Sequence, residues 1–202
     1  MHKKIGSDYF KLFTSPIFMI TSLVPSLMFG GYMSFIACGA FLYMETYDLP
    51  IMYYALLQGM IIGSFSLTSE YSGKINKYLG EKKSIFYGVS MLLFGALSLI
   101  TLSIFNLDGP SLTTISMVIC ALGTAISYPI IFMKSFDIFP DIRGAASSAI
   151  MSVRMLISSI VVALVSALYS GNLFIVAFIM LVVNIISTIL TIYIMKVISP
   201  LR

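Results

Sequence analysis

Six long apolar segments dominate this sequence of 202 residues. They span residues 16–43, 50–72, 84–105, 111–133, 145–168 and 173–195. Each is long enough to cross the hydrocarbon core of a bilayer, which takes about 20 apolar residues in a helix. The apolar runs are continuous rather than alternating, so they predict helices and not the strands of a membrane barrel. We therefore expect an all-α integral membrane protein, a bundle of six transmembrane helices forming one domain over residues 1–202.

Composition agrees with the bilayer as the main partner of this chain. Hydrophobic residues make up 59% of the sequence and charged residues only 10%. A soluble domain of this length does not need so much apolar surface. The net charge of +4 is spread over several connections. A nucleic-acid-binding surface would instead gather the basic residues on one folded face, so we expect no nucleic-acid partner.

The basic residues lie in every second connection. The first, third and fifth connections contain no Lys or Arg. Basic residues near transmembrane helices favour the cytoplasmic side, so we expect both termini in the cytoplasm. That arrangement requires an even number of spans, which six satisfies. The eleven residues on the cytoplasmic side are Lys3, Lys4, Lys11, Lys74, Lys77, Lys82, Lys83, Lys134, Arg143, Lys196 and Arg202.

Enzymatic and metal-binding functions find little support in the sequence. The two cysteines, Cys38 and Cys120, fall within predicted spans, and the single histidine is His2. These residues predict neither a zinc site nor a structural disulfide, and we expect no metal and no cofactor. A serine nucleophile with a histidine base and the H-E-x-x-H pattern are both missing, so we expect no enzyme and no catalytic residues. The short outer connections favour the cytoplasmic (inner) membrane of a bacterium.

Arg154 is the most unusual residue of the sequence. It lies ten residues beyond Gly144, so about 15 Å into the membrane at 1.5 Å per residue. A guanidinium there costs from ~3 to over 10 kcal/mol unless it meets water or a partner. Among the carboxylates only Glu70 falls within a predicted span, close to its cytoplasmic end. We expect either water in a cavity or another polypeptide to supply the counter-charge, and we place Arg154 on a substrate or proton pathway.

Other polar residues within the predicted spans are candidates for the same pathway. Gln58 lies in the middle of the second span, Tyr128 precedes Pro129 in the fourth, and Ser158 shares the helical face of Arg154. Asn184 lies in the middle of the sixth span. Alternatively, each of these residues forms a hydrogen bond between helices, which contributes ~0.6–2 kcal/mol. Both interpretations remain open.

Small residues form a smooth face on the fifth span. Such residues let helix backbones approach closely in membranes. The spacing therefore predicts a helix–helix interface, with a solute path as the alternative. The residues, at spacings of three, four and seven, are Ala145, Ser148, Ser152, Ser159, Ala163 and Ser166.

The longest connection, residues 73–83, resembles a known loop signature. Two glycines, Gly73 and Gly80, bracket an expected turn, and the basic pair Lys82-Lys83 follows. This pattern is similar to the loop G-x-L-A-D-R-x-G-R-K of major facilitator superfamily transporters. Lys77 occupies the position of the acid and Tyr78 that of the first arginine, so the copy is degenerate. Such a copy is typical of the second half of these transporters.

A second motif supports the same resemblance. It precedes Arg154 and contains Pro140, Asp141, Arg143 and Gly144. It resembles the start of the eleventh helix in drug:proton antiporters of the bicyclomycin/chloramphenicol-resistance type. Residues 8–10, which precede the first long span, are similar to the start of their seventh helix. The resemblance covers essentially the whole chain, but only the C-terminal six-helix half of a twelve-helix fold.

The resemblance implies a transmembrane transporter, or the C-terminal half of one, that exports drugs by proton-coupled alternating access. A transporter of a small metabolite, such as an amino acid or sugar, and a non-functional truncated fragment are the alternatives. The strict loop signature and the proton-handling carboxylate belong chiefly to the first half of the resembling antiporters. The resemblance therefore implies a small-molecule substrate and either a separate N-terminal half-transporter polypeptide or a homodimer as partner.

Overall fold

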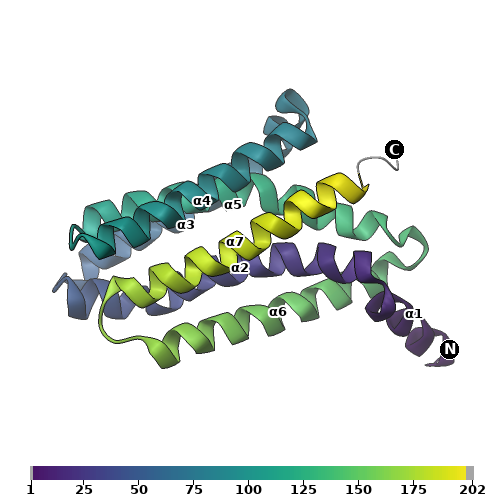
Figure 1. Cartoon of the computed structure of the whole chain (residues 1–202), viewed down its shortest axis with the longest axis horizontal. Coiled ribbons are helices and arrows are strands. Elements are labelled where there is room, and N and C mark those ends of the chain that lie inside the picture. Colours follow the sequence, from purple (N-terminus) through teal and green to yellow (C-terminus); the bar gives the residue numbers. More distant parts are fainter. Residues whose placement is uncertain (1, 199–202) are drawn as a thin grey trace.

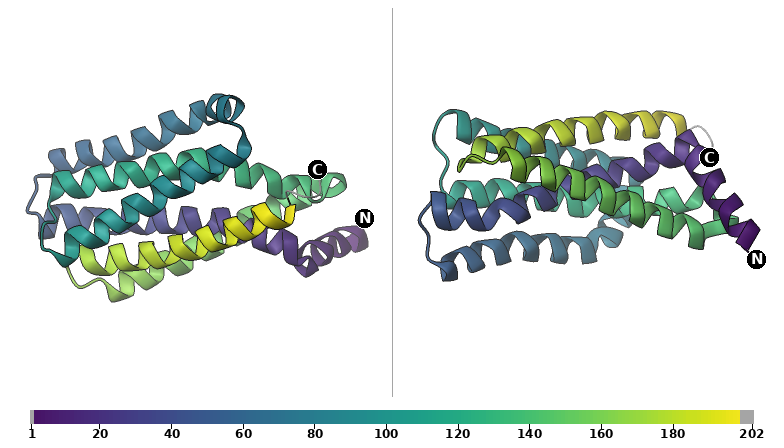
Figure 2. Two further views of the ribbon diagram at one scale, coloured as in Figure 1. Left: turned by 45° about the horizontal axis from the view of Figure 1, so that its top comes forward. Right: turned by 90° about the horizontal axis from the view of Figure 1, so that it is seen from below.

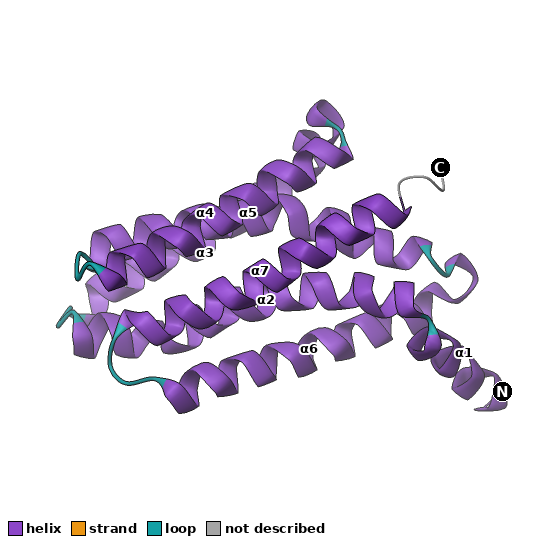
Figure 3. Cartoon of the chain, in the orientation of Figure 1, coloured by secondary structure: helices purple, strands orange, loops and turns teal. Residues whose placement is uncertain are grey.

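The computed structural model describes residues 2–198, with the side chains of residues 6–196; Arg202 lies outside this range. The described chain is helical throughout its regular structure, with no strand (Figures 1 and 3). Six of its helices are long and apolar enough to cross a membrane. The predicted all-helical class is thus confirmed, and each predicted span corresponds to one of these six helices.

The helices follow one another with very short connections. A separate short helix, α1 (His2–Thr14), precedes the first candidate span. That span is α2 (Pro16–Phe41), which begins at the Ser15 cap and continues into the π-helical turn η1 (Leu42–Thr46). The remaining elements are α3 (Ile51–Leu79), α4 (Glu81–Ile104), α5 (Pro110–Asp137), the 3₁₀ turn η2 (Pro140–Ile142), α6 (Arg143–Leu168) and α7 (Leu173–Ile198).

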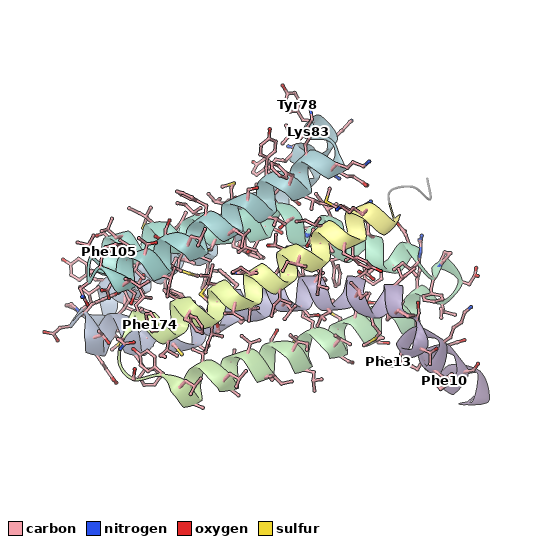
Figure 4. The ribbon with its side chains drawn as sticks, in the orientation of Figure 1. Phe10, Phe13, Tyr78, Lys83, Phe105 and Phe174 are labelled. Carbon is pink, nitrogen blue, oxygen red and sulfur yellow. The ribbon has the colours of Figure 1, made fainter. Side chains whose placement is uncertain are left out.

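The bundle has two distinct ends. Helix α1, the turn at Gly80, the α5–α6 connection and the end of α7 lie at one end (Figures 1 and 2). Side chains of Tyr78 and Lys83 mark the Gly80 turn in Figure 4, whereas Phe105 and Phe174 lie towards the opposite end. We call the first the basic end. The described basic residues outside the spans therefore gather at one end, as the alternating charge pattern predicts.

Helix α2 is the most buried of the six long helices and packs against α5, α6 and α7. Helix α5 lies between α3 and α4 and packs on both (Figure 2). The main core fills the space between these helices with side chains such as Met28, Phe35, Leu92 and Met117. At the basic end a smaller cluster joins Leu12 of α1 to Phe18 of α2 and Ile150 of α6.

The closest helix contact is between α4 and α5, and three glycines make it possible. A Cβ atom at Gly123 would lie 2.5 Å from the carbonyl oxygen of Gly88. A Cβ atom at Gly95 would lie 2.5 Å from the sulfur of Cys120. Real Cβ atoms do not approach this closely, so only glycine fits at these positions. Small residues let membrane helices pack backbone to backbone in this way.

The small-residue face of the fifth span is mostly uncovered by the described helices, although Ser148 on this face hydrogen-bonds to Tyr9 of α1. Within the described residues, α6 packs mainly on α2, through Ala146, Ala149 and Ile150 among others. The predicted face points outwards, and five of its six members are exposed: Ser148, Ser152, Ser159, Ala163 and Ser166. The expected interface within the bundle is therefore wrong. Spacing shows which residues share a face but not which face the neighbouring helix covers.

The predicted connection 73–83 is also shorter than expected. Helix α3 continues through Gly73 to Leu79, and α4 begins at Glu81. Gly80 alone reverses the chain, with φ of +80°, a conformation that favours glycine. No proline interrupts residues 73–79, and one glycine inside a helix costs only about 1 kcal/mol, so Gly73 does not end the helix.

Candidate functional site

Arg154 lies near the middle of α6, eleven positions after Arg143 and therefore about 16 Å along the helix axis. The helix belongs to a candidate span that extends from Pro140 to Leu168. Its side chain is half-buried. The structure thus places a charged group deep within an apolar segment, where its environment must offset a large desolvation cost.

Two aromatic residues from other helices hold the guanidinium of Arg154. Its Nη1 donates a hydrogen bond of 2.7 Å to the hydroxyl of Tyr128 on α5. Its Cζ lies 4.8 Å from the ring centroid of Phe29 on α2. A cation above an aromatic ring gains about 0.5–2 kcal/mol, most when the pair is desolvated. We call Arg154, Tyr128 and Phe29 the Arg154 site.

The positive charge of Arg154 is not neutralised within the described chain. The ion pairs there are Lys134–Glu81, at 2.5 Å, and Arg143–Asp137, at 3.4 Å, and neither involves Arg154. Its Nε is buried without a hydrogen-bond partner. From the sequence we expect that water in a cavity or another polypeptide compensates this charge. The chain itself supplies a phenol and a ring, which orient the guanidinium but carry no negative charge.

A row of aromatic rings leads from the Arg154 site along α5. Phe29 and Tyr128 pack with ring centroids 6.2 Å apart. Tyr128 and Phe132 are stacked at 5.5 Å, and Phe136 meets Phe132 edge-on at 4.9 Å. These four residues, the aromatic row, are all half-buried. Part of each side chain therefore remains accessible in the described structure.

Gln58 and Ser158 pack against glycines of α2, and Ser158 lies one helical turn after Arg154 on α6. Gln58 is buried on α3 beside Gly39, whose Cβ position is 3.4 Å from its Oε1. Ser158 is buried in the contact between α6 and α2, where the Cβ position of Gly30 is 3.4 Å from its Cα. Both have a buried side-chain oxygen without a hydrogen bond in the described structure.

Asn184 occupies a similar position on α7. It is fully buried beside Gly31 of α2, and both polar atoms of its amide lack a hydrogen-bond partner among the described residues. Buried amides without partners are costly in an apolar environment. The Gly30–Gly31 pair thus lets one polar residue from α6 and one from α7 approach the backbone of α2.

The residues of the loop motif lie around the α3–α4 turn at the basic end. Lys77, Lys82 and Lys83 are exposed, Gly80 makes the turn, and Gly73 lies within α3 with no atom close to its Cβ position. Glu81, at the first position of α4, pairs with Lys134 of α5. The motif residues therefore surround the turn, and Lys134, the partner of Glu81, lies six positions after Tyr128 on α5.

The second motif forms the start of α6. Pro140 and Asp141 make the turn η2, and Arg143 begins α6 and pairs with Asp137 at the end of α5. Gly144 has no atom within 4 Å of its Cβ position. This short connection joins the end of α5 to the start of α6 at the basic end.

Sequence reasoning singled out Arg154 and Tyr128 separately, and the structure joins them by a hydrogen bond. It missed Phe29, Phe132 and Phe136. The spacing of four between Tyr128, Phe132 and Phe136 could have indicated a shared face on one helix. Phe29 gave no comparable signal, because its contact with Arg154 crosses between helices far apart in sequence.

Comparison with known proteins adds no family to these observations. No protein-family model matches the chain, and no curated protein matches it.

Proposed function

We propose that this chain is one half of a membrane transporter and that the Arg154 site lies on the path of its solute. The observation that carries the proposal is the guanidinium in the middle of a candidate span, held by aromatic residues and left without a negative partner in the described chain. Ionisable residues at such depth are rare and usually serve solute or ion pathways.

We place the chain among major facilitator superfamily transporters as a C-terminal six-helix half. The degenerate loop around Gly80 and the motif before Arg154 support this assignment, as does the number of candidate spans. The gathering of basic residues at one end supports cytoplasmic termini. The short connections at the other end are consistent with the cytoplasmic membrane of a bacterium.

A second six-helix polypeptide is the partner that the proposal requires. Transporters of this kind enclose their solute between two bundles that rock against each other. The outward small-residue face of α6 suits such an interface, because small side chains allow close approach of helices. The partner is either a separate N-terminal half or a second copy of this chain.

Proton-coupled export of drugs is the activity we assign to the assembly. The half-buried aromatic row offers flat apolar surfaces to planar solutes. Arg154 would stabilise the ionised form of a carboxyl group facing it, because a nearby cation favours the anion. A metabolite transporter with the same architecture is the alternative, and the choice of solute in the assay decides between them.

The test is proton flux in vesicles that contain the chain together with its neighbouring-gene product or, without one, the chain alone. Addition of drugs should dissipate an imposed pH gradient, whereas amino acids and sugars should not. Arg154→Ala should abolish this flux, while Arg143→Gln, which removes a charge at the exposed start of the same helix, should preserve it. Equal flux in the Arg154→Ala and unaltered proteins would sink the proposal.

A further inference from the structure

We infer that the Arg154 site binds the carboxylate of an aromatic solute, so that the cargo is an organic anion. The binding site stands on its own geometry, whereas its role as a cargo site rests on the proposed transport function. The inference narrows the solute from drugs in general to one charge class. It also assigns the missing counter-charge of Arg154 to the cargo.

The sign of the charge favours an anion. Arg154 lies in the middle of a candidate span and contacts the neutral side chains of Tyr128 and Phe29, and the described ion pairs lie elsewhere, at the basic end. Electrostatic interactions are strong at such depth because the surroundings are poorly polarisable. A cationic solute would be repelled by the guanidinium, and a neutral solute would leave its charge uncompensated.

The hydrogen-bonding groups of the site are suited to a carboxylate. Nη1 of Arg154 donates to the Tyr128 oxygen, so the phenolic proton of Tyr128 is still free to be donated. Nη2 of Arg154 makes no hydrogen bond within the described residues. The guanidinium and the phenol together thus offer two donors close to each other. Charge-assisted pairs of this kind are shorter and stronger than neutral hydrogen bonds.

The aromatic row supplies the second half of the recognition. Tyr128, Phe132 and Phe136 extend from the guanidinium along α5 and are each half-buried. An aromatic ring attached to the bound carboxylate would lie beside these side chains, where offset stacking is favourable. Ring and charge are therefore recognised by adjacent parts of one surface.

A carboxylate from a partner polypeptide is the other source of the same chemistry. It would neutralise Arg154 permanently, and removal of Arg154 would then weaken the assembly. A cargo carboxylate neutralises Arg154 only while bound, so the assembly would not depend on it. The two sources thus differ in what Arg154→Gln does to the assembled mass.

The test measures binding of three probes of the same size to the full chain in nanodiscs of zwitterionic lipid. The probes are benzoate, benzamide and benzylammonium, which differ in charge, and saturation-transfer NMR titrations give their affinities. Arg154→Gln removes the charge, Arg154→Lys retains it, and Arg143→Gln is the matched control on the same helix. Circular dichroism and the elution volume of each variant establish that it is folded.

We expect benzoate to bind more tightly than either other probe, and Arg154→Gln to weaken it by about tenfold or more. Arg154→Lys and Arg143→Gln should keep the preference for benzoate. The inference is overturned if benzoate fails to saturate the unaltered chain, if Arg154→Gln binds it equally well, or if benzylammonium binds better. It is also overturned if Arg154→Gln dissociates an assembly that benzoate leaves intact.

The failures of the two proposals can be told apart. Suppose that drugs drive a proton flux that needs Arg154, but that the chain shows no preference for benzoate. The transport function is then supported, and the inference that the cargo is an anion is wrong. If the chain instead prefers benzoate in an Arg154-dependent way but shows no flux, the binding site is supported and the proposed transport function is wrong.

Discussion

Arg154 shows how one residue can be accommodated deep in an apolar bundle without a salt bridge. Placing a guanidinium at that depth costs from ~3 to over 10 kcal/mol. The phenol of Tyr128 and the ring of Phe29 offset part of this cost through a hydrogen bond and a cation–π contact. Nε remains buried and unpartnered, so the offset is incomplete. Binding of a negative group to Arg154 would therefore be energetically favourable.

The hydroxyl of Tyr128 should matter for stability as well as for position. Tyr128→Phe keeps the ring and its stacking on Phe132 but leaves Nη1 of Arg154 without an acceptor. We expect it to destabilise the chain by about 1–3 kcal/mol, the cost of an unmade hydrogen bond to a charged group. Thermal unfolding in detergent measures this, with Tyr193→Phe on the exposed face of α7 as control.

Equal unfolding temperatures for Tyr128→Phe and Tyr193→Phe would contradict the contact between Arg154 and Tyr128. A second variant, Phe29→Leu, tests the ring independently. It keeps an apolar side chain but removes the π face, so it should also lower the unfolding temperature. The expected loss is about 0.5–2 kcal/mol.

The sequence identifies a functional residue most clearly when burying that residue in an apolar helix costs much free energy. Arg154 stands out because a charge in an apolar run is expensive wherever the helix lies. Gln58, Ser158 and Asn184 are cheaper, so their types alone could not distinguish a pathway from a contact between helices. The structure places Gln58 and Ser158 beside glycines of α2, where neither side-chain oxygen has a hydrogen-bond partner among the described residues. Their partners depend on the arrangement of helices, which no local pattern encodes.

Among the helix contacts, that between α4 and α5 tolerates the least change. The backbones meet at Gly88, Gly95 and Gly123, with no room for a Cβ atom. Because the obstructing atoms are largely backbone, a side chain there must separate the helices. The contact therefore fixes the position of α5, and with it Tyr128 and the aromatic row.

Gly123→Ala should be strongly destabilising for its size. It adds one methyl group at 2.5 Å from the backbone of α4, and we expect a loss of about 1–3 kcal/mol of unfolding free energy. Gly59→Ala on α3 is the matched control, since nothing lies within 4 Å of its Cβ position. Alanine forms helices better than glycine, so the control should be neutral or slightly stabilising. Comparable melting of both variants would be incompatible with the close α4–α5 contact.

The exposed face of α6 makes a different prediction. If it meets a second bundle, the double variant Ser152→Leu, Ser159→Leu should prevent assembly by keeping the helices apart, while the chain itself stays folded. Ser90→Leu, at an exposed position of α4, should leave assembly unchanged. Mass measurement of the purified protein in detergent, alone and with its partner, gives the answer. Unimpaired assembly of the double variant would remove this face as the interface.

The residue range of each helix could be predicted from the sequence more reliably than the helices on which it packs. Apolar length identified the six spans, because the bilayer sets a minimum for every one of them. It placed the end of α3 too early, at Ser72, because polar residues can continue a helix beyond the membrane. It could not say that the glycines of α4 and α5 would meet while the serines of α6 face outwards. Both sets have similar spacing, and only the packed bundle distinguishes them.

At the scale of the whole molecule, the two ends of the bundle differ in charge. The basic end carries α1, the Gly80 turn and the α5–α6 connection, and the opposite end carries residues 47–50, 105–109 and 169–172 (Figure 1). Aromatic side chains such as Phe10, Phe13, Phe105 and Phe174 are exposed at the two ends (Figure 4). Aromatic residues favour both interfaces of a membrane, and basic residues favour the inner one.

Orientation can be tested with cysteine labelling. Cys38 and Cys120 are buried, so the unaltered protein should label poorly with a thiol reagent that cannot cross membranes. Asn172→Cys should label from the outside of intact cells, and Lys83→Cys only after the membrane is opened. The reverse result would invert the orientation that the charges predict.

The single glycine between α3 and α4 has a consequence for how the bundle is made. Although Gly80 alone joins them, these two helices scarcely touch, because α5 lies in the gap between them (Figure 2). When α3 and α4 leave the ribosome, the helix on which both will pack has not yet been synthesised. The pair must therefore remain tethered at one end, without the helix that fills the gap between them, until α5 has also been inserted. The packing of α3 and α4 into the bundle thus depends on a helix that comes after both of them in the sequence.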